Sequence, residues 1–141
     1  MSINAQVYAN YRNSSIETAS PGKLLLMLYN AAIKNLEDAN RAIAAHDMER
    51  CHRMLVKTQE IIVEFMCTLN MEYEISGKLL ALYEYMYRRL VEANLRKDTA
   101  IIDEVRGFLV ELRDTWQEAV NKAGSAAPRP GAVGRGLNIQ G

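Results

Sequence analysis

The chain has 141 residues, enough for one domain with a single hydrophobic core, and its 17 basic and 17 acidic residues give a formal charge of zero. The charges are interspersed without a basic stripe, which argues against a nucleic-acid binder. The N-terminus has no apolar stretch of the secretory type, and the longest apolar run, residues 24–29, is far shorter than the roughly 20 residues that span a bilayer, so we expect a cytoplasmic protein without membrane insertion.

Residues 1–17 form a polar N-terminal segment whose scattered apolar side chains follow no helical period. After it, Ser20 is suited to cap a helix and Pro21 to occupy the first helical position, where an N–H would have no partner. From there apolar residues recur every three or four positions, which predicts an amphipathic helix. Its stripe consists of Leu25, Leu28, Ala32, Leu36, Ala39 and Ile43.

A second helix is predicted by a heptad-like apolar repeat that follows Asp47, a suitable N-terminal cap. Cys51 and Cys67 lie about 24 Å apart along this helix, so they cannot form a disulfide with each other. We expect both thiols to be reduced, as in a cytoplasmic protein. The repeat consists of Met48, Cys51, Leu55, Thr58, Ile62, Phe65 and Leu69.

Two further helices are predicted in the second half of the chain. The start of the third helix is open, because Gly77 fits either its first turn or a break before it. The fourth begins near Asp98 or Thr99, either of which is a suitable cap. The third stripe consists of Ile75, Leu79, Leu82, Met86, Leu90 and Ala93. The fourth consists of Ile102, Val105, Leu109, Leu112, Trp116 and Ala119.

Short connections between four long helices require each helix to run antiparallel to the next. The sequence therefore predicts an all-α fold, an antiparallel up-down-up-down four-helix bundle over residues 18–123. The N-terminal segment, residues 1–17, is expected to lie on this bundle. Residues 124–141 are rich in Gly, Pro and Ala and are predicted to be a disordered C-terminal tail.

The bundle pattern raises the question of a di-metal site, which requires a Glu-x-x-His motif on each of two helices. Glu49 and His52 supply one such motif and the sequence holds no second, so we expect no metal and no cofactor. Glu60 and Glu64 point away from the predicted core stripe and fit a solvated charged face. With no phosphate-binding loop and no nucleophile–base pair, we do not expect an enzyme.

Two of the predicted helices carry more apolar surface than one core stripe requires. On the second helix the additional residues are Val56, Val63 and Cys67. On the third helix they are Leu80, Tyr83, Tyr87 and Val91. These residues either widen the core or form a partner-binding surface, and for the two stripes together we favour the second interpretation. The handedness of the bundle decides whether the stripes share one surface or lie on opposite flanks.

Three segments of the chain resemble the flagellin-specific export chaperones of bacteria, the FliS family. They are TASPGKLLLMLYNAAI (residues 18–33), LYEYMYRRLVEAN (82–94) and VELRDTW (110–116), in the family's order and spacing. The resemblance extends over about residues 8–120. It departs from the family pattern in NMEYEISGKLL (70–80), where Lys78 precedes Leu79 in place of the family's asparagine and the usual Gly-Gly stretch is missing.

The resemblance implies a small cytoplasmic chaperone that holds the disordered C-terminal segment of newly made flagellin. In the family that segment folds into helices along apolar grooves of the bundle, which prevents premature filament assembly and presents the subunit to the flagellar export gate. The resemblance implies neither catalysis nor a nucleotide. The family's N-terminal segment, with tyrosines where this chain has Tyr8 and Tyr11, can lie over the bundle and cover part of the groove.

On this basis we expect flagellin to contact the additional apolar residues of the second and third helices, with Tyr8 and Tyr11 as a movable cover. The alternative is a self-associating structural bundle, in which the same stripes form a symmetric interface between copies of the chain. Sedimentation of the purified protein would distinguish the two hypotheses.

Overall fold

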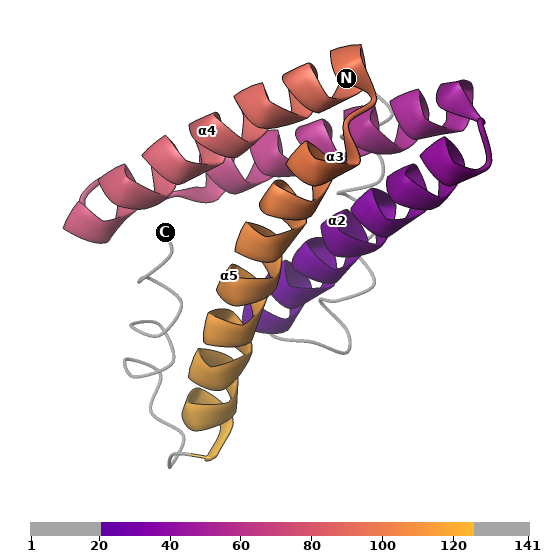
Figure 1. The fold of residues 1–141 in the computed structure, drawn as a ribbon. Coiled ribbons are helices and arrows are strands. Elements are labelled where there is room, and N and C mark those ends of the chain that lie inside the picture. The colour runs from indigo at the N-terminus through magenta and orange to yellow at the C-terminus, as the bar shows by residue number, and fades with distance from the viewer. Residues whose placement is uncertain (1–20, 126–141) are drawn as a thin grey trace.

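Four α-helices make up the part of the chain that the structure describes, residues 21–125 of a computed structural model (Figure 1). With the labels of Figure 1 they are α2 (Pro21–Ala44), α3 (Met48–Thr68), α4 (Glu74–Arg96) and α5 (Thr99–Ser125). This confirms the predicted all-α fold class. The expectations for Ser20, for the N-terminal segment and for residues 126–141 of the predicted tail lie outside the described residues and stay predictions. Residues 124 and 125, predicted as the start of the tail, instead end α5.

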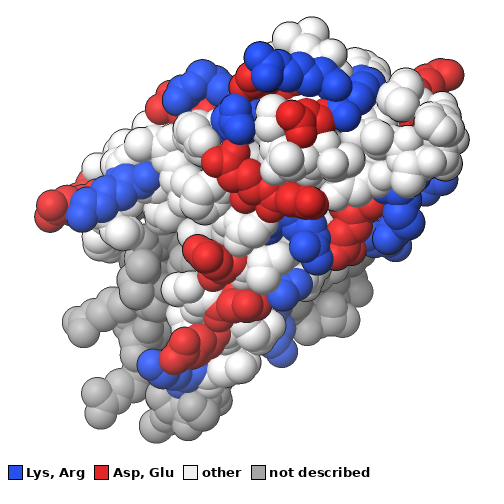
Figure 2. All heavy atoms as spheres, viewed as in Figure 1, with Lys and Arg blue, Asp and Glu red and all other residues white. Residues whose placement is uncertain are grey.

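The helices form a closed cycle in which each packs against two neighbours. α3 packs against α2 and α4, and α5 packs against α4 and α2. Figure 1 shows α4 and α5 close together where a short connection joins them and diverging away from it. Acidic and basic side chains are mixed over the face drawn in Figure 2. None of the described helices combines the length and the apolar character that crossing a membrane requires.

The helix ends follow the chemistry of their capping residues. A side-chain oxygen of Asp47 accepts a hydrogen bond from the Arg50 N–H at 3.1 Å, which confirms its predicted role at the start of α3. Asp98 accepts from the Ala100 N–H at 2.8 Å, so Asp98 rather than Thr99 caps α5. Because α4 begins at Glu74, Gly77 lies in its first turn.

The connection before α4 coincides with the stretch that departs from the family pattern. Here the side chain of Asn70 accepts a hydrogen bond from the Glu72 N–H at 3.0 Å, and its carbonyl accepts from the Tyr73 N–H at 3.2 Å. These two bonds close a tight turn. The turn does not involve Lys78, which follows it within α4.

Most residues of the predicted stripes form the core. Two residues at helix starts are exposed, and six are half-buried; the six are Ile43, Leu69, Leu79, Leu82, Leu112 and Ala119. Met48 and Ile75 lie in the first turns of α3 and α4, where the core has ended, and are 39% and 40% exposed. The stripe residues that are fully or almost fully buried are Leu25, Leu28, Ala32, Leu36, Ala39, Cys51, Leu55, Thr58, Ile62, Phe65, Met86, Leu90, Ala93, Ile102, Val105, Leu109 and Trp116.

Candidate functional site

The two flanks of α4 are identified by their polar contacts with the neighbouring helices. On one flank the Tyr85 hydroxyl and the Arg89 Nε donate hydrogen bonds to Glu104 of α5, at 2.6 and 2.8 Å. On the opposite flank the side-chain nitrogen of Asn94 lies 2.8 Å from His52 Nδ1 of α3. The flank that carries Asn94 therefore faces α3.

Helical geometry places both additional stripes on the flanks that meet at the His52–Asn94 contact. At 3.6 residues per turn, Leu80, Tyr87 and Val91 lie within about 60° of Asn94 around α4. By the same reasoning three residues of α3 lie within about 60° of His52; they are Val56, Val63 and Cys67. The stripes consequently border one shared seam between α3 and α4, which resolves the alternative that the sequence left open.

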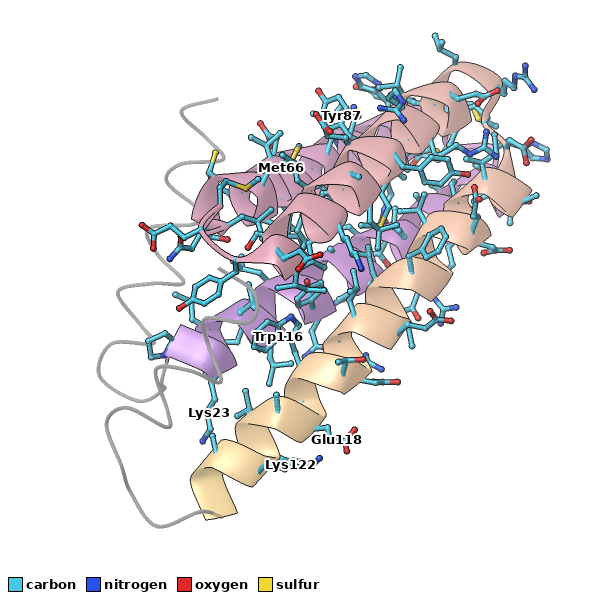
Figure 3. All side chains as sticks on the ribbon, turned by 90° about the vertical axis from the view of Figure 1, so that its left-hand side faces the viewer. Lys23, Met66, Tyr87, Trp116, Glu118 and Lys122 are labelled. Carbon is cyan, nitrogen blue, oxygen red and sulfur yellow. The ribbon has the colours of Figure 1, made fainter. Side chains whose placement is uncertain are left out.

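We call this surface the α3–α4 face; it consists of Val56, Val63, Met66, Cys67, Leu80, Tyr87 and Val91. The additional residues named from the sequence do not include Met66. Its position three residues after Val63 places it on the same flank of α3 and could have indicated it. Figure 3 shows Met66 and Tyr87 on the same side of the α3 and α4 pair. Both side chains are partly buried and pack against the core.

The α3–α4 face is apolar and only partly covered. Val56, Val63 and Leu80 are half-buried without belonging to the packed core, and Cys67 is exposed as a free thiol. Val91 is 40% exposed. Apolar side chains left partly exposed in this way are typical of a site that binds another protein, and the half-buried Gln59 adds one polar side chain to the same flank of α3.

Tyr83 does not belong to this surface, and its prediction as a partner-contacting residue is wrong. Its side chain is 1% exposed and its ring lies against Phe65, with the ring centroids 5.4 Å apart. Its hydroxyl forms a 2.6 Å hydrogen bond with the hydroxyl of Tyr29 on α2. That bond satisfies the polar end of a side chain that would otherwise be costly to bury.

Burial also shifts the pKa values of the Tyr29 and Tyr83 hydroxyls. Burial raises the pKa of the Tyr83 hydroxyl to about 12. Burial, together with the nearby Tyr83, also raises the pKa of Tyr29, which in addition hydrogen-bonds to the side chain of Trp116. Tyr29 stacks on Phe65 with ring centroids 4.4 Å apart, so α2, α3 and α4 each contribute one ring to an aromatic cluster of Tyr29, Phe65 and Tyr83.

A polar contact closes the seam at the end of the α3–α4 face. The ammonium of Lys97 donates to the backbone carbonyl of Asn94 at 2.8 Å and also to its side-chain oxygen. Because that oxygen is occupied, the amide N–H₂ of Asn94 faces Nδ1 of His52. This arrangement ties the start of α3 to the end of α4.

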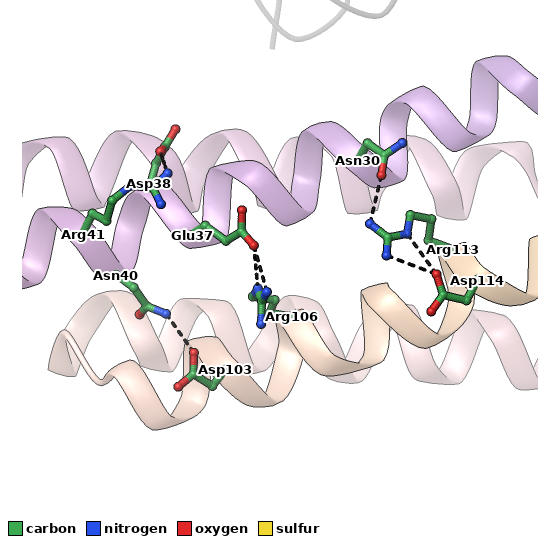
Figure 4. A network of polar contacts seen from close by, with 9 residues as sticks. All are labelled: Asn30, Glu37, Asp38, Asn40, Arg41, Asp103, Arg106, Arg113 and Asp114. Atoms are coloured by element: carbon green, nitrogen blue, oxygen red, sulfur yellow. Dashed lines mark hydrogen bonds and ion pairs between the residues drawn. The ribbon is translucent and has the colours of Figure 1, made fainter. Parts of the chain in front are cut away.

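The seam between α2 and α5 differs, because polar side chains close it (Figure 4). Arg106 donates to Glu37 from Nε at 3.1 Å and from a terminal nitrogen at 2.8 Å. Asn40 donates to Asp103 at 2.8 Å. Further along, Arg113 joins Asn30 and Asp114, each at 3.1 Å. This seam is occupied by its own contacts, in contrast to the α3–α4 face.

The residues considered for metal binding are engaged in other contacts. Glu49 pairs with Arg53 at 3.5 Å, and His52 contacts Asn94. Among the described residues, no group of three or more His, Cys, Asp or Glu side chains is placed to hold a metal ion. The residues that define the α3–α4 face are apolar, so they can bind a partner through apolar contacts.

Comparisons with known proteins show which family the chain resembles. The family model described as "Flagellar protein FliS" matches residues 4–123. The flagellar secretion chaperone FliS of Bacillus subtilis is 46% identical over 113 residues, which cover 80% of this chain and 85% of that protein. FliS of Salmonella typhimurium is 35% identical, over 78% of this chain and 84% of that protein. FliSB of Pseudomonas aeruginosa is 34% identical, over 75% and 89%.

These relatives are named as secretion chaperones, which is not a class of enzyme, and the family model covers the four-helix bundle except for the last two residues of α5. The chain therefore belongs to the FliS family of flagellar proteins.

Proposed function

We propose that this protein binds the C-terminal segment of flagellin in the cytoplasm, prevents its premature polymerisation and delivers it to the flagellar export gate. Membership of a family of flagellar secretion chaperones supports a flagellar protein as the cargo. The observation that carries the proposal is the α3–α4 face, an apolar surface that the bundle itself leaves partly uncovered.

The dimensions of the α3–α4 face suit a short amphipathic helix. Leu80 to Val91 on α4, and Val56 to Cys67 on α3, each extend over about 16 Å, or three helical turns. A cargo helix with apolar residues at i, i+3 or i+4 and i+7 would place one anchor per turn on this face. A segment without structure of its own can fold as it binds, at a free-energy cost that moderates the affinity and aids release.

The N-terminal segment supplies the second part of the proposal. We infer that residues 1–17 lie on the bundle, with Tyr8 and Tyr11 as a cover that cargo displaces. Both tyrosines lie outside the described residues. Their aromatic rings and hydroxyls suit a surface that alternates between protein and water.

Isothermal titration of the full chain with a peptide that covers the C-terminal segment of flagellin from the same organism tests this function. We expect one-to-one binding with a large negative heat-capacity change and a gain in helical circular dichroism, because apolar surface is buried while the peptide folds. No detectable heat at several temperatures, with both components intact, would contradict the proposal.

Sedimentation of the protein without flagellin tests the alternative of self-association. If the α3–α4 face serves cargo, the Val91→Asp and wild-type chains should sediment alike. A stable dimer that Val91→Asp dissociates, and that does not bind flagellin, would favour a structural bundle instead.

A further inference from the structure

The core stripe of α4 is buried in the second half of the helix and partly exposed in the first half. In its second half Met86, Leu90 and Ala93 are completely buried. In its first half Leu79 and Leu82 are only half-buried, and Ile75 is 40% exposed. Side chains in the register of a core stripe are thus left without full cover near the start of α4.

The core stripe of α5 is more exposed in the part of the helix that lies beyond its contact with α4. Val105 and Leu109 are completely buried, whereas Leu112 and Ala119, on either side of the buried Trp116, are half-buried. The cause is the divergence of the two helices, which Figures 1 and 3 both show. We call the uncovered surface the open edge; it consists of Ile75, Leu79 and Leu82 of α4 and Leu112 and Ala119 of α5.

Charged side chains border the open edge, with three acids against two lysines. Glu111 and Glu118 are exposed along the part of α5 that follows its contact with α4, and Glu74 is exposed at the start of α4. The lysines are Lys78, one turn after Ile75, and Lys122, one turn after Ala119. Figure 2 shows acidic side chains following one another along α5, with basic side chains near its end. Lys122 there pairs with Glu118 at 3.3 Å. An apolar strip with a net acidic border suits a basic, partly apolar occupant.

Residues 126–141 have this composition and begin where α5 ends. Their only charged residues are Arg129 and Arg135, and their larger apolar residues are Val133, Leu137 and Ile139. By contrast, the charged residues of the N-terminal segment, Arg12 and Glu17, cancel. The region matched by the family model ends at residue 123, so this basic segment is a property of the chain beyond that match.

The segment is long enough to reach the whole of the open edge. From Ser125 back to Leu112 the distance along α5 is about 20 Å at 1.5 Å per residue. An extended segment of the length of residues 126–141 spans about 50 Å. Its composition supplies too few apolar side chains for a core of its own, but a preformed apolar strip would provide the missing partner surface.

We propose that residues 126–141 bind the open edge of their own chain. Arg129 and Arg135 lie toward the acidic border formed by Glu111 and Glu118, and Leu137 and Ile139 cover the apolar strip. The attachment is intramolecular, so a weak contact suffices for substantial occupancy. Because its polar part is electrostatic and exposed, it weakens as salt shortens the Debye length from about 8 Å at physiological ionic strength.

Paramagnetic relaxation in the full chain tests this contact. A spin label is attached at position 140 through Gln140→Cys, in a chain whose exposed thiol is removed by Cys67→Ser. The remaining Cys51 is completely buried, and burial raises the pKa of its thiol, so it reacts poorly with the label. We expect the label to broaden the amide signals of Leu79 and Leu82, and the broadening to diminish in high salt.

Charge reversal provides the matched control. Arg129→Glu with Arg135→Glu should abolish the broadening on α4, and adding Glu111→Lys with Glu118→Lys should restore it. Broadening that charge reversal leaves unchanged would overturn the proposal. So would broadening confined to the last turn of α5, which the tether alone produces, or broadening at Val56 and Val91 instead of the open edge.

Discussion

Tyr83 and Tyr87 lie one helical turn apart on the same flank of α4, yet one is completely buried and the other half-exposed. The sequence predicts both in one surface stripe. Helical periodicity indicates the direction in which a side chain points from its helix, but not which residue of another helix it contacts. The difference arises from Tyr29 on α2, whose hydroxyl bonds to that of Tyr83. No local pattern in the sequence contains this pairing.

The buried hydroxyls make stability depend on alkaline pH. The ordinary tyrosine pKa is 10.0, and burial raises that of Tyr83 to about 12. Above pH 10 the unfolded chain loses a proton that the folded chain keeps, so the stabilisation is complete below that pH and is lost as pH rises toward 12. Urea unfolding should show the free energy of unfolding fall by up to about 1.4 kcal/mol per pH unit for each such group.

Tyr83→Phe removes the titrating group and keeps the ring. This variant should lose about 1 kcal/mol of stability at neutral pH, the usual contribution of one hydrogen bond, and should show a shallower alkaline fall. Tyr87→Phe is the matched control on the same helix. An equal alkaline slope in Tyr83→Phe and the wild type would contradict the assignment of the raised pKa to this pair.

At the scale of whole elements, α4 and α5 are linked by a local cluster of contacts around Glu104. Tyr85 and Arg89 donate hydrogen bonds to its carboxylate, and the ring of Phe108 meets that of Tyr85 edge-on at 6.2 Å. Beyond this cluster the helices diverge. The apolar stripes predicted both helices but not their divergence, since the same stripes fit parallel and splayed axes.

The Glu104 cluster predicts a specific sensitivity to acid. The hydrogen bonds from Tyr85 and then Arg89 lower the pKa of Glu104 below its ordinary value of 4.5. Its stabilising contribution is therefore present above pH 4.5 and is lost as pH falls through the lowered value. Thermal unfolding should show a steeper acid loss in the wild type than in Glu104→Gln. Parallel acid profiles would show that the carboxylate contributes nothing.

The α4–α5 connection also predicts the effect of removing a helix cap. Asp98→Ala should destabilise the protein by about 1 kcal/mol, because the Ala100 N–H loses its acceptor at the start of α5. Gln117→Ala, which removes an exposed polar side chain within the same helix, is the control and should be nearly neutral. Denaturant midpoints measure both. Equal losses in the two variants would refute the capping role.

At the scale of the whole molecule, the bundle has two contrasting seams. Arg106 and Glu37 help close the α2–α5 seam with polar contacts, whereas Val56, Tyr87 and Val91 leave the α3–α4 face apolar and partly uncovered. The sequence predicted the bundle and the surplus apolar residues, because both depend on local periodicity. It could not place the two stripes on one seam, which follows from the His52–Asn94 contact between distant segments.

We propose that flagellin binds the α3–α4 face, and a titration with two matched variants is the sharpest test of this contact. Val91→Asp places a charge on the face, and Ala81→Asp places the same charge on an exposed position of the same helix away from it. Calorimetry with the flagellin C-terminal peptide should show Val91→Asp binding at least about tenfold more weakly, a difference of about 1.4 kcal/mol, while Ala81→Asp binds like the wild type. Circular dichroism should show both variants folded. Wild-type affinity in a folded Val91→Asp chain would contradict the account.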